Sequence, residues 1–109
     1  MKVSVVLCSI LFVSTFASSQ HYTPKSGFVP DSATAVRVAE AVLVPVYGEQ
    51  KIMSERPFTA ALKNDVWTVT GTLHCPDGKG GTTTYCDGGT ATVKISKIDA
   101  RILSMVHGK

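Results

Sequence analysis

The amino-acid sequence predicts an α+β domain in which one main N-terminal helix packs on a four-stranded antiparallel sheet. Three observations support this class. Between Asp31 and Gly48, apolar residues recur at helical spacing. After Pro57, apolar and polar residues alternate, as in strands that have one solvated face. Turn-forming residues divide this alternating region into four segments, which gives the element order αββββ.

The first 19 residues have the pattern of a secretory signal peptide. Lys2 provides a positive start, residues 3–16 form an apolar run, and small residues follow. We predict cleavage after Ser19, with cleavage after Ala17 as the alternative. The apolar run is shorter than the roughly 20 residues of a membrane-spanning helix. We therefore predict an exported protein that does not insert into the membrane after cleavage, with about 90 residues left for a single domain.

The predicted mature chain divides into a lead and a domain. Residues 20–29 contain proline and glycine and no periodic pattern, so we predict a flexible lead. Phe28 is predicted to anchor the lead to the domain, in preference to Tyr22. Residues 30–109 form the predicted domain.

The predicted helix begins at Asp31 or Ser32, either of which can cap it. Pro45 cannot donate a main-chain hydrogen bond and should kink or end the last turn. Gly48 then ends the helix, and residues 49–57 should form a short helical turn or a loop. The stripe that faces the sheet consists of Ala35, Val36, Ala39, Val42, Leu43 and Val46.

The strands are predicted at residues 58–62, 66–73, 90–95 and 101–106. Asn64 and Asp65 should form the turn between the first two. Threonines alternate with the apolar residues and should fill the outer face of the sheet. The predicted inward-facing side chains are Phe58, Ala60, Leu62, Trp67, Val69, Leu73, Ala91, Val93 and Ile95.

Cys75 and Cys86 remain after removal of the leader, because Cys8 lies within it. Two cysteines in an exported protein favour a disulfide. It would close the glycine-rich loop over residues 74–89 and stabilise the domain by roughly 2.5–3 kcal/mol in the chain-entropy treatment. Free thiols are the first alternative. A metal site that includes His74 is the second, although the spacing matches no common zinc motif.

The charge balance argues against a nucleic-acid partner. Once Lys2 is removed, ten Lys and Arg face eight Asp and Glu, and no basic run is present. The acidic residues are scattered as well, so they predict no acidic patch that would steer a basic partner.

No catalytic group is placed on the predicted inner face of the sheet. Acid–base catalysis would need a carboxylate or a histidine there, with its pKa shifted by burial. A disulfide would remove the cysteine nucleophiles. His107 is predicted to be an ordinary strand-end residue, but burial beside Glu49 or Glu55 would reopen the question of catalysis. The four turn aspartates, which favour local hydrogen bonding, are Asp65, Asp77, Asp87 and Asp99.

Protein binding is the chemistry that the remaining side chains support best. Tyr85 lies in the loop that the disulfide would close, and a rigid loop loses less entropy on binding. An equally simple reading is that the disulfide only stabilises a small core. Trp67 alternates in phase with Val69 and is assigned to the core. The candidate partner-binding residues are Tyr47, Glu49, Arg56, Tyr85, Asp87 and Arg101.

Three stretches in order carry a family resemblance. They are residues 30–49, with AVRVAEAVLVPVYGE; residues 55–73, with ERPF followed by LKNDVWTVTGTL; and residues 88–109, with GGTA, ISKIDARIL and a final HGK. Together they resemble the bacterial immunity proteins that have a nuclear-transport-factor-2-like, or cystatin-like, fold. Asp65 and Ala100 stand at turn positions where the family pattern leads us to expect glycine.

The resemblance implies a non-enzymatic protein that neutralises a cognate antibacterial toxin by stoichiometric binding, with no cofactor and no metal. Combined with the signal peptide, it implies action in the periplasm. A toxin that acts on the cell wall or the membrane is then a better match than a nuclease. The first alternative is an exported domain of the same shape that holds a small apolar ligand in a cavity of about 300 Å³ or more. An exported hydrolase or isomerase ranks third.

Overall fold

The structure is a computed structural model that describes residues 9, 10, 12 and 21–109. The predicted signal peptide and its cleavage site lie outside the described residues, apart from the first three of these positions. Within the described part of the chain, no helix has both the length and the apolar character needed to cross a membrane.

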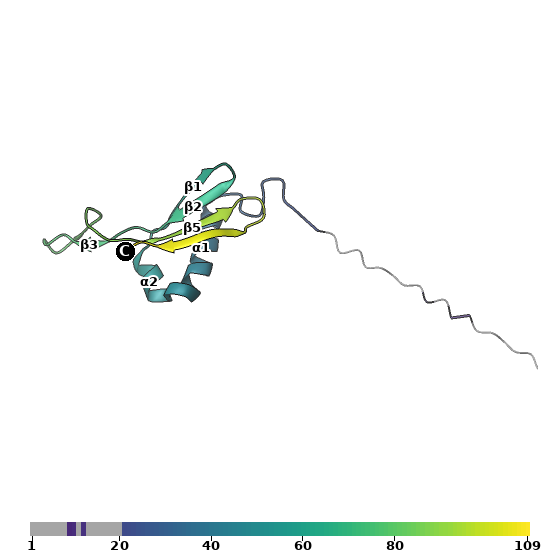
Figure 1. The fold of residues 1–109 in the computed structure, drawn as a ribbon, viewed down its shortest axis with the longest axis horizontal. Helices are drawn as coiled ribbons and strands as arrows, with labels where there is room; N and C mark the ends of the chain where they lie inside the picture. Colours follow the sequence, from purple (N-terminus) through teal and green to yellow (C-terminus); the bar gives the residue numbers. More distant parts are fainter. Residues whose placement is uncertain (1–8, 11, 13–20) are drawn as a thin grey trace, which may run out of the picture.

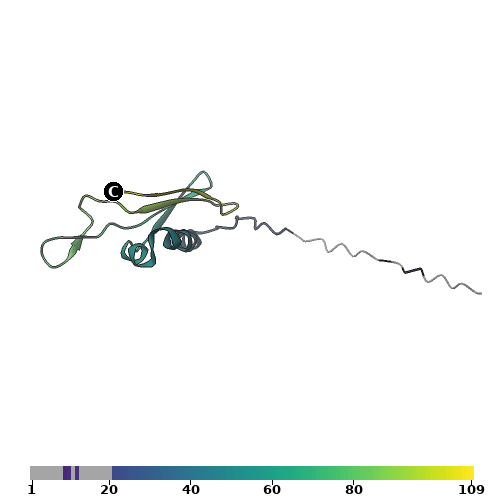
Figure 2. The ribbon, with the colours of Figure 1, turned by 60° about the horizontal axis from the view of Figure 1, so that its bottom comes forward.

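Both helices lie on one face of the main sheet (Figures 1 and 2). The described elements are α1 (Ser32–Tyr47), α2 (Glu49–Ser54), β1 (Thr59–Lys63), β2 (Val66–Thr70), β3 (Cys75–Pro76), β4 (Thr82–Thr83), β5 (Ala91–Ser96) and β6 (Ile102–His107). The main sheet has the order β1-β2-β5-β6, and all of its neighbours are antiparallel. The predicted α+β class, with a main helix on a four-stranded antiparallel sheet, is therefore confirmed.

Helix α1 begins where the sequence predicts. The Asp31 Oδ1 accepts a hydrogen bond from the main-chain N–H of Thr34 at 2.7 Å, which caps the first turn. Pro45 lies inside the last turn, and the helix continues for two residues beyond it. Gly48 then ends the helix with φ 93°, a conformation that glycine adopts without steric cost. The short helical turn predicted after it is helix α2.

The register of the sheet follows from the tight turn between β1 and β2. Asn64 and Asp65 both have positive φ, 50° and 59°, as a two-residue hairpin turn requires. The turn pairs Lys63 with Val66. Every second residue of each strand, including Trp67 and Val69, therefore faces the helices. The predicted outer face is observed, because Thr59, Thr68, Thr70 and Thr92 all lie on the side away from α1.

The core lies between α1 and the centre of the sheet. Its buried apolar residues are Val29, Ala35, Ala39, Leu43, Ile52, Phe58, Trp67, Val69, Ala91, Val93 and Ile95. The assignment of Leu62 to the core is wrong: it is 45% exposed, because it lies near the hairpin end of an edge strand. Leu73 is only half-buried, since β2 ends at Thr70 and the chain leaves the sheet before reaching it.

The lead is attached to the sheet through Val29. Phe28, the predicted anchor, is 47% exposed, whereas Val29 is fully buried. The main-chain N–H of Val29 donates to the Lys97 carbonyl at 3.0 Å, and its own carbonyl accepts from Trp67 Nε1 at 2.8 Å. The prediction of Phe28 is wrong because both residues are apolar and adjacent, and the sequence does not show which one points inward.

The predicted loop before β5 contains a second, smaller hairpin. Strands β3 and β4 pair Cys75 with Thr83 and Pro76 with Thr82. This hairpin and the residues after it project from one end of the main sheet, as Figure 1 shows at the β3 label. We call the segment over residues 75–86 the disulfide finger.

Candidate functional site

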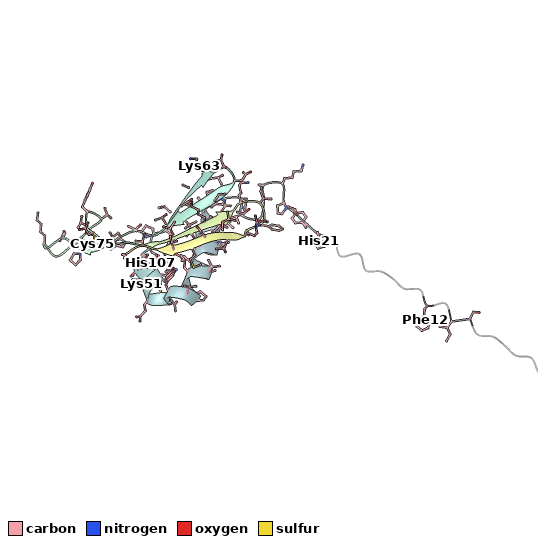
Figure 3. The ribbon with its side chains drawn as sticks, in the orientation of Figure 1. Phe12, His21, Lys51, Lys63, Cys75 and His107 are labelled. Carbon is pink, nitrogen blue, oxygen red and sulfur yellow. A yellow bond between two sulfur atoms is a disulfide. The ribbon has the colours of Figure 1, made fainter. Side chains whose placement is uncertain are left out.

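Most residues of the disulfide finger are exposed, and none of them is buried. Cys75 and Cys86 form the predicted disulfide at its base, with their Cα atoms 6.3 Å apart. Figure 3 labels Cys75 on the finger, beyond the end of the main sheet. At the tip, Asp77 Oδ1 accepts hydrogen bonds from the N–H groups of Lys79 at 2.7 Å and Gly81 at 3.0 Å. The turn is therefore ordered by its own side chain as well as by the disulfide.

Tyr85 lies on the finger just before the second cysteine and is 95% exposed. Asp87 follows the disulfide and is exposed as well. A large aromatic side chain on a covalently closed loop can bury much area on a partner at a small cost in entropy. The placement of these two residues suits the predicted protein contact.

Helix α2 lies at the end of the domain from which the finger projects (Figure 1). Three candidate residues flank it: Tyr47 ends α1, Glu49 begins α2, and Arg56 follows α2. Arg56 forms a bidentate pair with Glu40, through Nε to Oε1 at 2.9 Å and Nη2 to Oε2 at 2.8 Å. The hydrogen bond and the charge of Glu40 raise the pKa of Arg56, and Glu49 adds to this effect. The guanidinium therefore stays charged and is held on α1, so a partner would meet an oriented ion pair rather than a free arginine.

Arg101 lies at the opposite end of the sheet. It follows the turn between β5 and β6, where its side chain pairs with Asp99 at 3.1 Å. The finger instead joins the end at which Ala91 pairs with His107. The six predicted partner-binding residues are thus spread over two ends of the molecule and do not form one continuous surface.

A buried carboxylate, which the sequence analysis did not predict, lies between α2 and the ends of β5 and β6. Glu55 is only 7% exposed. Its Oε1 accepts from the main-chain N–H of Ala91 at 2.6 Å, and its Oε2 lies 3.1 Å from His107 Nε2. Glu55 follows a short polar segment and pairs with a residue 52 positions away, so no local pattern in the sequence could reveal it.

The Glu55–His107 pair meets the condition that reopens the question of catalysis, and each of its polar atoms also lies within hydrogen-bond distance of a protein group. His107 Nδ1 lies 2.7 Å from the Gly108 carbonyl oxygen. Both ring nitrogens and both carboxylate oxygens therefore have partners within the protein. The ring also packs against Tyr47, with centroids 5.2 Å apart. These contacts link Glu55, which follows α2, to the last strand of the sheet.

The metal alternative finds no support among the described residues. They contain no group of three or more His, Cys, Asp or Glu side chains placed to hold a metal ion. His74 Nε2 lies 2.6 Å from the Arg56 carbonyl, and the two cysteines bond to each other.

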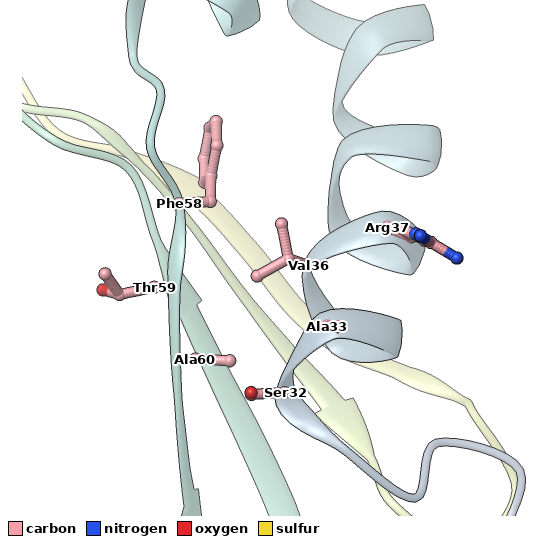
Figure 4. Close-up of a pocket in the computed structure, with 7 residues that line it drawn as sticks. All are labelled: Ser32, Ala33, Val36, Arg37, Phe58, Thr59 and Ala60. Atoms are coloured by element: carbon pink, nitrogen blue, oxygen red, sulfur yellow. The ribbon is translucent and has the colours of Figure 1, made fainter.

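A groove of about 530 Å³ lies between the first half of α1 and strand β1. Its lining residues are Ser32, Ala33, Val36, Arg37, Phe58, Thr59 and Ala60. In Figure 4, Val36 points from α1 toward the strand that carries Phe58, Ser32 faces Ala60, and Arg37 and Thr59 point away from the groove. The helix and the strand meet here mainly through small side chains, which is why space remains between them. The sequence analysis did not predict this feature.

Comparison with known proteins identifies relatives. A family model described as "NTF2 fold immunity protein" matches residues 34–109. YhhH, an uncharacterized protein of Escherichia coli strain K12, is 29% identical over 101 residues, which cover 93% of this chain and 72% of that protein. No solved structure matches the chain significantly.

Proposed function

Because the chain belongs to the NTF2 fold immunity protein family, we propose that it protects a bacterial cell by binding and neutralising a cognate antibacterial toxin. The family match carries this proposal. It spans both helices and every strand of the domain, apart from the first two residues of α1. The predicted signal peptide supports action in the periplasm, where the toxin would attack the cell wall or the membrane.

We further propose that neutralisation occurs by stoichiometric binding. The family is normally non-enzymatic, and the buried Glu55–His107 pair is fully engaged within the fold. The finger supplies a contact surface in Tyr85, whose side chain touches little of its own protein. Blocking the toxin through such a surface needs no chemistry from this chain.

Competition between sibling strains tests the proposal. A strain that lacks this gene should be killed by siblings that deliver the toxin, and the full chain supplied on a plasmid should restore survival. A version without residues 2–19 should remain in the cytoplasm and fail to protect. Survival of the deletion strain beside such siblings would refute toxin neutralisation, whereas protection by the leaderless version would refute only the periplasmic location.

The groove favours a second candidate function, the binding of a small apolar ligand, because its volume lies in the range of ligand pockets. The position of the groove is less favourable for a small ligand, because most of a bound molecule would stay in contact with solvent. Ser32, Ala33, Arg37 and Thr59 are exposed, so the groove is open at the edge of the domain, while Phe58 and Trp67 fill the space between helix and sheet. Mass spectrometry of the protein under non-denaturing conditions tests this second function. If the protein binds a small apolar ligand in the groove, the spectrum should show one bound molecule per chain.

A further inference from the structure

The free edge of β1 has the properties of a binding site for an extended peptide segment. Strand β1 is at one end of the sheet order, so only β2 pairs with it. Residues that flank a two-residue hairpin turn form a hydrogen-bonded pair, and such pairs alternate along the ladder. The N–H and C=O groups of Lys63, Ala61 and Thr59 therefore point to β2, and those of Ala60 and Leu62 point outward.

The groove lies on the helix side of this same edge, beside Ala60. A strand added next to β1 would place every second side chain on the face of the sheet that α1 covers. Those side chains would meet Ala33 and Val36 on α1 and Phe58 on the sheet, which are apolar. The groove is thus the space that an apolar side chain of an added strand would fill.

Charge indicates the chemistry of the segment. Lys63 lies at the end of β1 and is exposed (Figure 3). Among the described residues, the ion pairs join Arg56 to Glu40, Arg101 to Asp99 and His107 to Glu55, and none involves Lys63. A carboxylate on the added segment would complement this cation.

The other edge of the sheet is less suited to strand addition. The register of β6 on β5 shifts between Lys94 and Ile95, which marks an irregularity in the ladder. Bulges of this kind protect edge strands from pairing with other chains. Strand β1 keeps a continuous register over all five of its residues.

We propose that the toxin adds an extended segment to the free edge of β1, with an apolar side chain in the groove and a carboxylate beside Lys63. This proposal rests on the proposed function, because it assumes that the partner is the toxin. It assigns the main contact to β-strand addition, in which main-chain hydrogen bonds give affinity and the groove gives specificity.

Two substitutions that fill the groove test the proposal, each with a matched control. Ala60→Phe fills the groove from the strand, and Ala33→Phe fills it from the helix. Because Ala33 is exposed, its substitution should leave the folded structure intact. Ala61→Phe and Ala41→Phe place the same side chain on exposed positions of the same two elements, outside the groove. We expect the first two to weaken binding of the purified toxin by about tenfold or more, and the controls to change it by less than about twofold.

Amide hydrogen exchange gives a direct readout of strand addition. In the free protein, the amides of Ala60 and Leu62 should exchange faster than those of Ala61 and Lys63, and toxin binding should slow them by about tenfold or more. The toxin is defined as the secreted protein that kills the deletion strain. Unchanged exchange at Ala60 and Leu62, together with normal binding by both groove-filling variants, would overturn strand addition and leave neutralisation intact. Failure of the wild-type chain to neutralise any such protein would overturn both proposals.

Discussion

The carboxylate of Glu55 and the imidazole of His107 lie 3.1 Å apart and join the end of α2 to the end of β6. The same carboxylate accepts from the Ala91 amide at the start of β5. One side chain thus ties the helical layer to two neighbouring strands. Its main-chain carbonyl adds a further link, because it accepts from the Thr72 amide at 2.7 Å.

Removal of this carboxylate should destabilise the domain strongly. Glu55→Ala leaves the buried Ala91 amide and His107 Nε2 without their partner, so we expect the free energy of unfolding to fall by about 2–4 kcal/mol. Glu55→Gln keeps an acceptor for the amide and should cost less. Urea unfolding with the disulfide intact measures both. Glu49→Ala, an exposed change in α2, is the control, and a Glu55→Ala variant as stable as that control would contradict the structural role.

Ala100 and Asp65 have positive φ, 62° and 59°, at the two turn positions where the family pattern leads us to expect glycine. Alanine is strained in this conformation by about 1–2 kcal/mol, and glycine is more flexible in the unfolded chain. Ala100→Gly should therefore stabilise the protein by about 0.5–1 kcal/mol, and Asp65→Gly by less. Ala61→Gly, in an extended strand, should destabilise it. Thermal unfolding shows whether each variant is more or less stable than the wild type. The Ala100 side chain packs against the core. A destabilised Ala100→Gly variant would show that this packing outweighs the backbone strain.

The disulfide should contribute to both stability and binding. Changing Cys75 and Cys86 together to serine opens a loop with ten residues between its ends, and the chain-entropy treatment predicts a loss of about 2.5–3 kcal/mol. Tyr85→Ala removes a side chain that is 95% exposed, so it should leave unfolding unchanged. If the finger contacts the toxin, both variants should bind it more weakly. A Tyr85→Ala protein with normal affinity would exclude this tyrosine from the interface.

The cap of α1 should make stability depend on acidic pH. The hydrogen bond from the Thr34 amide lowers the pKa of Asp31, so the folded state favours the ionised carboxylate. Its stabilisation is complete above the ordinary pKa of about 3.9 and is lost as the pH falls through the lowered value. Asp31→Asn can still cap but does not titrate. The difference in free energy of unfolding between wild type and variant should shrink below about pH 4. A difference that does not change with pH would show that the ionised Asp31 carboxylate does not stabilise the cap.

Local patterns in the sequence were sufficient to predict the helix, its Asp31 cap, the Asn64–Asp65 turn and the alternating burial of β5. Each of these depends on residues that are close together along the chain. Leu62 was misassigned because alternation gives the face of a strand but not whether a helix covers it. The Glu55–His107 pair and the groove depend on contacts between distant segments, and no spacing in the sequence encodes those contacts.

A titration of toxin activity with this protein is the most direct test of neutralisation by stoichiometric binding. A fixed amount of the purified toxin would be mixed with increasing amounts of the protein, and killing of the deletion strain would be measured. The account predicts a linear loss of killing that is complete at one protein per toxin, with both chains eluting together as one complex. Full protection at a small fraction of one equivalent would indicate catalytic inactivation, and undiminished killing at excess protein would contradict neutralisation itself.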